Sequence, residues 1–179
     1  MVANKTYSID FTSNSTFKTV LDSSTYLVYN STVVKKYDNN IAAPQAVYIA
    51  PKAITIVDIL FGANYSEVFV VVKNSYLSNY SLLQIENNKL SKNVSIPVST
   101  AFPFCKSIYN STRVYLLFSS ALLAYNSGNI KIVKSIVFAI NNSRTSMSLL
   151  LSYIAYSYSN KAYIIDSNFS QIYSYTAAN

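Results

Sequence analysis

The feature that most constrains this chain is a succession of short runs of β-branched and aromatic residues, separated by clusters rich in Asn and Ser. No segment shows a convincing helical period of 3.6 residues, whereas short runs between turn-forming residues are typical of β-strands. The sequence therefore predicts an all-β fold, with an antiparallel β-sandwich or jelly-roll-like head as the expected architecture. The runs are residues 25–29, 47–60, 67–73, 113–118, 130–140, 149–158, 161–166 and 171–176.

A weak internal repeat suggests an alternative, which is a small β-propeller-like repeat protein. Four stretches share an apolar run, a polar turn, a short strand and a Tyr; they are residues 26–37, 69–80, 114–125 and 162–173. Their starts lie 43, 45 and 48 residues apart, close to the period of a propeller blade. Propellers use Gly at their turns, however, and this chain has only two Gly.

The first twenty residues differ from the rest, so we expect a tail at 1–20 and a β-rich globular head at 21–179. Tyr7, Ile9 and Phe11 alternate with polar residues, and an extended strand would place them on one face. Asn4 and Asn14 would then face the opposite way. These three apolar residues are candidate donor-strand contacts in a neighbouring subunit, although an ordinary first strand within the same chain obeys the same rule.

The motif Asn-x-Ser/Thr, the acceptor for an N-linked sugar, is unusually frequent. The chain has 19 Asn and 39 Ser or Thr, from which random placement would give about four such motifs. An AT-rich genome explains part of the excess only, because Asp, Glu and His are depleted. We therefore predict N-glycosylation, which would place the protein outside the cell. The nine sites are Asn4, Asn14, Asn30, Asn64, Asn79, Asn93, Asn110, Asn141 and Asn168.

Two of these motifs occur in the same tetrapeptide, Tyr-Asn-Ser-Thr, at residues 29–32 and 109–112. Each copy lies beside a run of β-branched and aromatic residues. We interpret both copies as strand ends that turn outward and carry sugar.

The residues that usually carry catalysis are scarce. There is no His, Cys105 is the single cysteine, and the carboxylates are scattered singly at Asp10, Asp22, Asp38, Asp58, Glu67, Glu86 and Asp166. We predict a non-enzyme with no catalytic, cofactor-binding or metal-binding residues, the only covalent additions being N-glycans. A secreted hydrolase whose carboxylates meet only in space remains an outside candidate.

The charge and hydropathy patterns exclude two further classes of partner. The net charge is +7, but the 14 Lys and Arg form no stripe, so nucleic-acid binding is not expected. No apolar run approaches the roughly 18 residues of a membrane-spanning helix. No signal peptide is visible, so a secreted protein would be the mature chain without its leader.

Two non-enzyme functions remain. One is a structural subunit of an extracellular filament or surface coat. The other is a secreted β-rich adhesin, or a binding module associated with a surface layer, in which Tyr-rich strands would suit stacking against sugars.

The chain resembles the pilin-like subunits of archaeal thread filaments of thermoacidophiles. The resemblance rests on a Cys-poor chain rich in Tyr, Ser, Asn and Val, a glycosylation motif about every twenty residues and an extended polar N-terminal segment. It implies a homopolymer of identical subunits, joined head to tail by donor-strand complementation. It further implies a secreted cell-surface appendage that contacts host or neighbouring cell surfaces.

Overall fold

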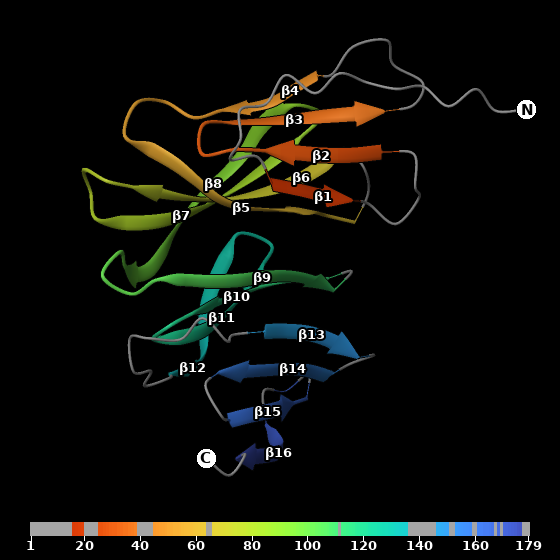
Figure 1. The fold of residues 1–179 in the computed structure, drawn as a ribbon, viewed down its shortest axis with the longest axis vertical. Coiled ribbons are helices and arrows are strands. Elements are labelled where there is room, and N and C mark those ends of the chain that lie inside the picture. The colour runs from red at the N-terminus through yellow and green to blue at the C-terminus, as the bar shows by residue number, and fades with distance from the viewer. Residues whose placement is uncertain are drawn as a thin grey trace, which may run out of the picture.

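The computed structural model describes most of the 179-residue chain as short antiparallel strands (Figure 1). No helix occurs in the part of the chain that it describes. The described residues are 16–19, 25–38, 45–63, 66–110, 112–135, 146–150, 153–158, 161–166, 168 and 170–176.

The strands form four sheets of four, and within each sheet every strand pairs with the next one along the chain. The first sheet contains β1 (Thr16–Thr19), β2 (Thr25–Tyr29), β3 (Val33–Asp38) and β4 (Gln45–Ile49). The second contains β5 (Ile54–Phe61), β6 (Glu67–Asn74), β7 (Asn79–Glu86) and β8 (Lys89–Ser99). The third contains β9 (Phe104–Asn110), β10 (Arg113–Phe118), β11 (Ala121–Asn126) and β12 (Asn129–Ser135). The fourth contains β13 (Ser146–Leu150), β14 (Tyr153–Tyr158), β15 (Lys161–Ile165) and β16 (Gln171–Thr176).

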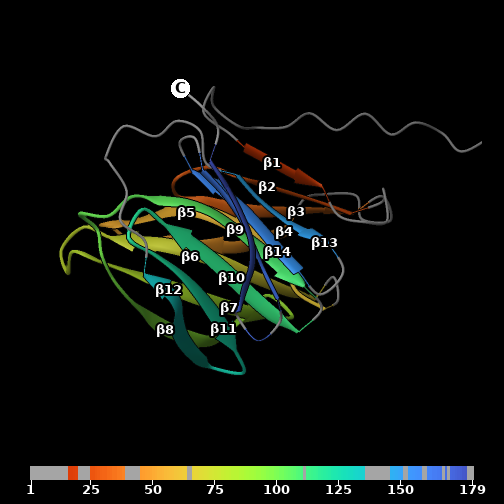
Figure 2. The same ribbon diagram turned by 90° about the horizontal axis from the view of Figure 1, so that it is seen from below.

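The sheets follow one another in chain order, and each packs face to face on the next (Figures 1 and 2). Three buried clusters fill the spaces between them. Leu27 and Val34 meet Val70 between the first and second sheets, and Val71 meets Leu116 between the second and third. The third cluster, between the third and fourth sheets, joins Leu117, Ile154 and other residues of both sheets. At one side of the stack the first strands of successive sheets adjoin, since β9 contacts both β5 and β13.

This architecture confirms the all-β class, but the predicted sandwich is wrong. A sandwich has two packed sheets, whereas this chain forms four successive meanders stacked face to face, as the blades of a β-propeller are. The prediction failed because alternation along a strand shows that one or two faces are buried, and says nothing of which sheet covers them. The alternative, a propeller-like repeat, fits the topology.

The scarcity of Gly did not prevent tight turns between the strands. Ser78, Asn87, Asn88 and Ser127 adopt positive φ angles of 51°, 51°, 60° and 50°, the left-handed conformation that usually favours Gly. Asn tolerates this conformation better than most residues because its short polar side chain bonds locally. The turns therefore use Asn and Ser where many propellers use Gly, and only Gly128, at 99°, follows the usual rule.

The internal repeat corresponds to real hairpins, although the match is incomplete. Residues 26–37, 69–80 and 114–125 each span the second and third strands of a sheet. The fourth stretch, 162–173, spans β15 and β16, which are the third and fourth strands of their sheet. Three of the four stretches are thus structurally equivalent, and the last is displaced by one hairpin.

Part of the predicted tail belongs to the first sheet. Thr16–Thr19 form β1, which pairs with β2 in register Thr16↔Tyr29. The candidate donor-strand residues Tyr7, Ile9 and Phe11 lie outside the described residues, and donor-strand exchange therefore stays a prediction.

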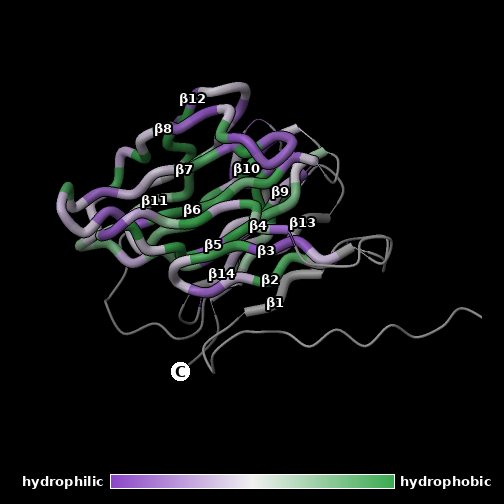
Figure 3. Tube along the Cα trace, turned by 90° about the horizontal axis from the view of Figure 1, so that it is seen from above, coloured by the Kyte–Doolittle hydropathy of each residue, from purple (hydrophilic) through white to green (hydrophobic). Residues whose placement is uncertain are grey.

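Hydrophobic residues concentrate on the middle strands of the second and third sheets, and polar residues on the connections and outer strands (Figure 3). The outer strand β8 shows this best, because most of its residues are exposed. Within the described part of the chain, no helix has the length and apolar character needed to cross a membrane.

Candidate functional site

The two Tyr-Asn-Ser-Thr copies form the same kind of turn between antiparallel strands. Asn30 Oδ1 accepts hydrogen bonds from the backbone N–H groups of Thr32 (2.8 Å) and Val33 (2.9 Å). Asn110 Oδ1 likewise accepts from the N–H of Arg113 (3.0 Å) and from the Thr112 hydroxyl (3.1 Å). In each turn the carboxamide oxygen is engaged by the backbone, as in an Asx-turn, which leaves the amide nitrogen as the atom available to a sugar.

The two turns lie at opposite ends of the strands, on opposite edges of the stacked sheets, which the sequence did not reveal. The Asn30 turn joins the second and third strands of its sheet, whereas the Asn110 turn joins a first and a second strand. The Asn30 turn also docks on the connection between the first two sheets, because Ile56 N–H donates to the Ser31 carbonyl (2.8 Å). We call these the Asn30 end and the Asn110 end.

The other described glycosylation motifs differ in accessibility. Asn93 on β8 and Asn168 between β15 and β16 are exposed. Asn79, at the start of β7, is half-buried, and its Oδ1 is enclosed without a hydrogen-bond partner among the described residues. Asn4, Asn14, Asn64 and Asn141 lie outside the described residues. Asn30 and Asn110 are half-buried as well, so what sets Asn79 apart among the five described sites is the enclosure of its carboxamide oxygen.

A buried carboxylate links the first three sheets at the Asn30 end. Asp58 follows a β-bulge in β5 and is 6% exposed. Its Oδ1 accepts hydrogen bonds from the Tyr29 hydroxyl (3.3 Å) and the Ile59 N–H (2.9 Å), and its Oδ2 accepts from the Ser107 hydroxyl (2.5 Å). Because Tyr29, Asp58 and Ser107 belong to successive sheets, this network fixes the stacking of three blades.

A cavity of about 600 Å³ opens beside this network. Two lysines, Lys73 and Lys106, line it together with the rings of Tyr29, Tyr80 and Phe104. Burial raises the pKa of Tyr80 above its usual value of 10, so its hydroxyl remains a hydrogen-bond donor near neutral pH. The Asp58 carboxylate lines the cavity as well, so a ligand there would meet two positive groups and one negative group beside the aromatic residues.

At the Asn110 end, two carboxylates that are far apart in sequence come together. Glu67 and Glu86 are cross-strand partners of β6 and β7. Gln84 separates their charges, since its Nε2 donates to Glu67 Oε1 (2.7 Å) and Glu86 Oε1 (2.8 Å). Its Oε1 accepts from the Tyr125 hydroxyl (2.6 Å). Like charges directly opposite each other destabilise a sheet, and a bridging amide relieves this repulsion.

The connection between β5 and β6 wraps closely around the Glu67 carboxylate. The Ala63 N–H donates to Glu67 Oε2 (2.8 Å), and a side chain at Gly62 would collide with the same carboxyl group. A side chain at Gly62 would therefore displace the Glu67 carboxylate from this position.

Two tyrosines beside this carboxylate pair stay protonated well above neutral pH. Burial, followed by the negative charge of Glu67, raises the pKa of Tyr109. Burial also raises the pKa of Tyr125, with smaller contributions from Glu67 and Glu86. Tyr109 and Tyr125, together with Glu67, line a cavity of about 150 Å³. No group of three or more His, Cys, Asp or Glu side chains able to hold a metal occurs among the described residues.

Sequence reasoning missed the meeting of Glu67 and Glu86, although a signal was present. The two residues lie at equal distances from the turn between Asn74 and Asn79, which are themselves cross-strand partners. A hairpin centred on that turn places them opposite each other. The two carboxylates look isolated in the sequence as long as no register is assigned to this hairpin.

Comparisons with known proteins identify the fold alone. No protein-family model matches the sequence, and no curated protein sequence matches it. A chain in a crystal structure of the mitotic checkpoint complex has a TM-score of 0.66 at 10% identity, over 87% of this chain and 49% of that one. An oligogalacturonate lyase in complex with manganese has a TM-score of 0.59 at 14% identity, over 87% and 52%.

The WD40 domain of SCAP from fission yeast has a TM-score of 0.51 at 12% identity, over 86% of this chain and 42% of that one. WD40 domains are β-propellers, which agrees with the blade arrangement described above. The chain spans about half the length of the structures it matches. Since one of these structures is a lyase, the fold is compatible with both binding and catalysis.

Proposed function

We propose that this chain is an N-glycosylated structural subunit of an extracellular assembly of identical copies, serving surface attachment or cell-cell contact. The observation that carries the proposal is the placement of the described glycosylation motifs. Four of these motifs lie on turns at either end of the strands or on an exposed strand; they are Asn30, Asn93, Asn110 and Asn168. Sugars at these sites would cover the connections without entering the buried clusters.

The outer strand of the second sheet gives this proposal a physical rationale. β8 is eleven residues long and lies at the edge of its sheet, where unpaired backbone groups invite another strand. Lys89, Lys92 and Asn93 are exposed on it. Charges and a sugar at this edge would prevent lateral strand pairing, so that contacts between copies stay limited to dedicated surfaces.

How successive copies join remains a separate proposal. We retain donor-strand complementation by the segment containing Tyr7, Ile9 and Phe11 as the head-to-tail contact. Replacing Ile9 and Phe11 with Asp would place charges in an apolar groove and should abolish polymers. Polymers that survive this double replacement would rule out the donor strand.

The experiment that tests the function is done on native material. Mass spectrometry of glycopeptides should find sugar on Asn30, Asn93, Asn110 and Asn168, and unmodified Asn79. Electron micrographs of the same preparation should show polymers of this chain. Unmodified peptides at three of the four accessible sites, or a preparation of single particles only, would contradict the proposal.

A carbohydrate-binding module is the second candidate, and the 600 Å³ cavity favours it. Lys73 and Lys106 would face the carboxylate of an acidic sugar, and Tyr29, Tyr80 and Phe104 would supply ring contacts. A glycan array should then show binding to uronic acid-containing oligosaccharides that the double variant Lys73→Gln/Lys106→Gln loses. Exposed lysines away from the cavity, such as Lys89 and Lys131, are the matched control positions.

A further inference from the structure

The fourth sheet has one face that no other sheet covers among the described residues. Its inner face packs on the third sheet through Met147, Ile154, Tyr156 and Ile165, all at most 4% exposed. We call the opposite face the outer face. The alternation of side chains along the strands, together with their register, shows which residues lie on it. Its described side chains are those of Ser148, Tyr153, Ala155, Ser157, Ala162, Ile164, Tyr173 and Tyr175.

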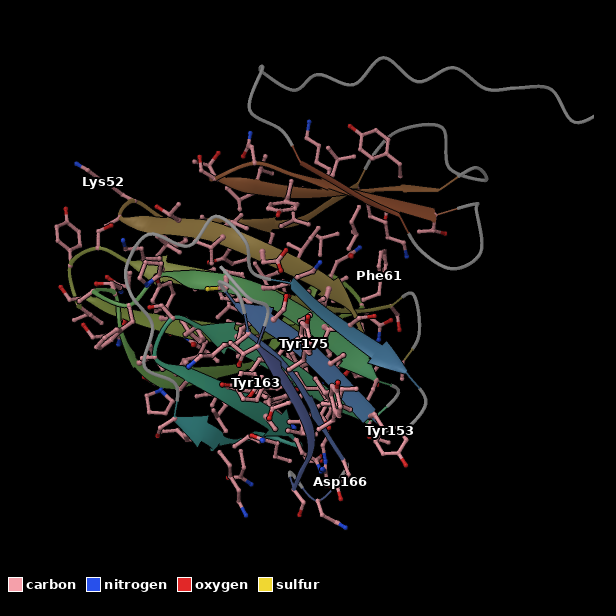
Figure 4. The ribbon with its side chains drawn as sticks, turned by 60° about the horizontal axis from the view of Figure 1, so that its bottom comes forward. Lys52, Phe61, Tyr153, Tyr163, Asp166 and Tyr175 are labelled. Carbon is pink, nitrogen blue, oxygen red and sulfur yellow. The ribbon has the colours of Figure 1, made fainter. Side chains whose placement is uncertain are left out.

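Large aromatic side chains on the outer face are solvent-exposed. Tyr153, Tyr173 and Tyr175 are 37%, 54% and 55% exposed, whereas Tyr156 on the inner face is 2% exposed and stacks on Tyr163 at 5.2 Å. Figure 4 shows Tyr153 and Tyr175 on the strands of this sheet, at the end of the stack. In the three inter-sheet contacts of the molecule, the equivalent faces are buried against a neighbouring sheet.

The opposite end of the stack does not offer a similar surface. On the first sheet, Leu27 and Tyr29 face the second sheet, so alternation directs Val28 away from it, together with Tyr37. Val28 is 1% exposed and Tyr37 5%, so these side chains are already buried in the single chain. Among the side chains that the structure describes, the open aromatic face is that of the fourth sheet, and a contact between two copies through it would use the same face of both.

The composition of the outer face suits a second copy better than a charged partner. None of these eight residues is charged, although the chain carries a net charge of +7. Two copies can therefore meet there without bringing lysines directly opposite each other. Tyr is enriched at protein contacts because it contributes a large contact area at a small loss of side-chain entropy.

We propose that the outer face of the fourth sheet is a self-association surface, which packs on the same face of a second copy to form an isologous dimer. The inference deepens the proposed function, because it names one contact between identical subunits. Four strands about 4.8 Å apart, each of about five residues rising about 3.3 Å, give a face of about 300 Å² in projection. Contacts of this size are weak, so the dimer should form only at high protein concentration.

The test uses the full chain produced without glycosylation, with its mass in solution measured over a wide concentration range. The wild type should pass from monomer to dimer, and the double variant Tyr173→Asp/Tyr175→Asp should weaken dimerisation at least tenfold. Hydrogen exchange should show that β14, β15 and β16 become more protected as the wild type associates. A wild type that stays monomeric at all concentrations, or a variant that dimerises as well as the wild type, would overturn the proposal.

Two controls separate the surface from folding and from the function proposed above. Tyr76→Asp makes the same change on the exposed turn between β6 and β7, where Tyr76 is 76% exposed, and should leave dimerisation unchanged. The melting temperature of each variant shows whether it folds. Because the dimer is measured on unglycosylated protein, its absence refutes this surface, whereas the absence of sugars and polymers from native material refutes the function.

Discussion

The second and fourth sheets have the same topology, but they differ in how many of their faces are covered. In β6, five consecutive residues from Val68 to Val72 are at most 3% exposed. Val68, Val70 and Val72 face the first sheet, and Phe69 and Val71 face the third. In β14, by contrast, Tyr153 is exposed and Ile154 is buried. β6, in a sheet between two others, is buried on both faces, whereas β14 of the fourth sheet is buried on one.

The third sheet follows the rule of the second. Val114, Leu116 and Phe118 of β10 pack toward the second sheet, while Tyr115 and Leu117 pack toward the fourth. All five residues are at most 1% exposed. The middle strands β6 and β10 of the two interior sheets are thus buried on both faces, unlike β14 of the fourth sheet.

The largest expected effect contrasts a tyrosine of an interior sheet with one of the terminal sheet. Tyr115 is 1% exposed between the third and fourth sheets, and Tyr173 is 54% exposed on the outer face. Tyr115→Ala should lower the free energy of unfolding by about 3–5 kcal/mol, because it removes a large buried ring. Tyr173→Ala should change it by about 0.5 kcal/mol or less. Urea unfolding at low protein concentration measures both, and equal losses would break the comparison.

A smaller effect is expected from the network that links the first three sheets. Ser107→Ala removes one hydrogen-bond donor from the buried Asp58 carboxylate and should destabilise the protein by about 1–3 kcal/mol. Ser91→Ala, on the exposed strand β8 and outside any glycosylation motif, is the matched control and should be nearly neutral. Hydrogen exchange should then show faster opening of β5 and β9 than of β16. Uniform acceleration across all four sheets would mean that the network does not act locally.

The Asn30 turn should contribute less again. Asn30→Ala removes the acceptor for two backbone N–H groups and should destabilise unglycosylated protein by about 1 kcal/mol. Asn93→Ala on exposed β8 should have no measurable effect. If both variants unfold at the same urea concentration as the wild type, the turn at the Asn30 end is not held by its side chain.

The smallest effect is a dependence of stability on alkaline pH, which we expect from Tyr109 and Tyr125 between the second and third sheets. Burial raises the pKa of Tyr109 and Tyr125 above their ordinary value of 10. The stability that this provides is complete below pH 10 and is lost as the pH rises through the raised pKa values, since the unfolded chain loses its protons first. Urea unfolding between about pH 8 and about pH 11 should show this loss. Unchanged stability up to about pH 11 would contradict it.

Local patterns in the sequence determined the all-β class and many of the strands of this protein, although β7, β8 and β9 match none of the predicted runs. β-branched and aromatic runs, together with Asn and Ser clusters, predicted an all-β fold, and three of the four repeated stretches proved to be equivalent hairpins. The same patterns could not distinguish a sandwich from stacked blades. Both bury alternate or continuous apolar residues, and the choice depends on which sheet covers which face, a contact between residues far apart in the chain.

The candidate sites divide in the same way. The sequence by itself determined the nine glycosylation motifs and the two matching turns at Asn30 and Asn110. Only the tertiary structure decided that Asn79 is half-buried and that the two turns lie at opposite ends. The tertiary structure also enclosed Asp58 among three sheets, whereas the pairing of Glu67 with Glu86 follows from the register of one hairpin. A motif is read from neighbours along the chain, whereas burial depends on neighbours in space that only the packing of the sheets supplies.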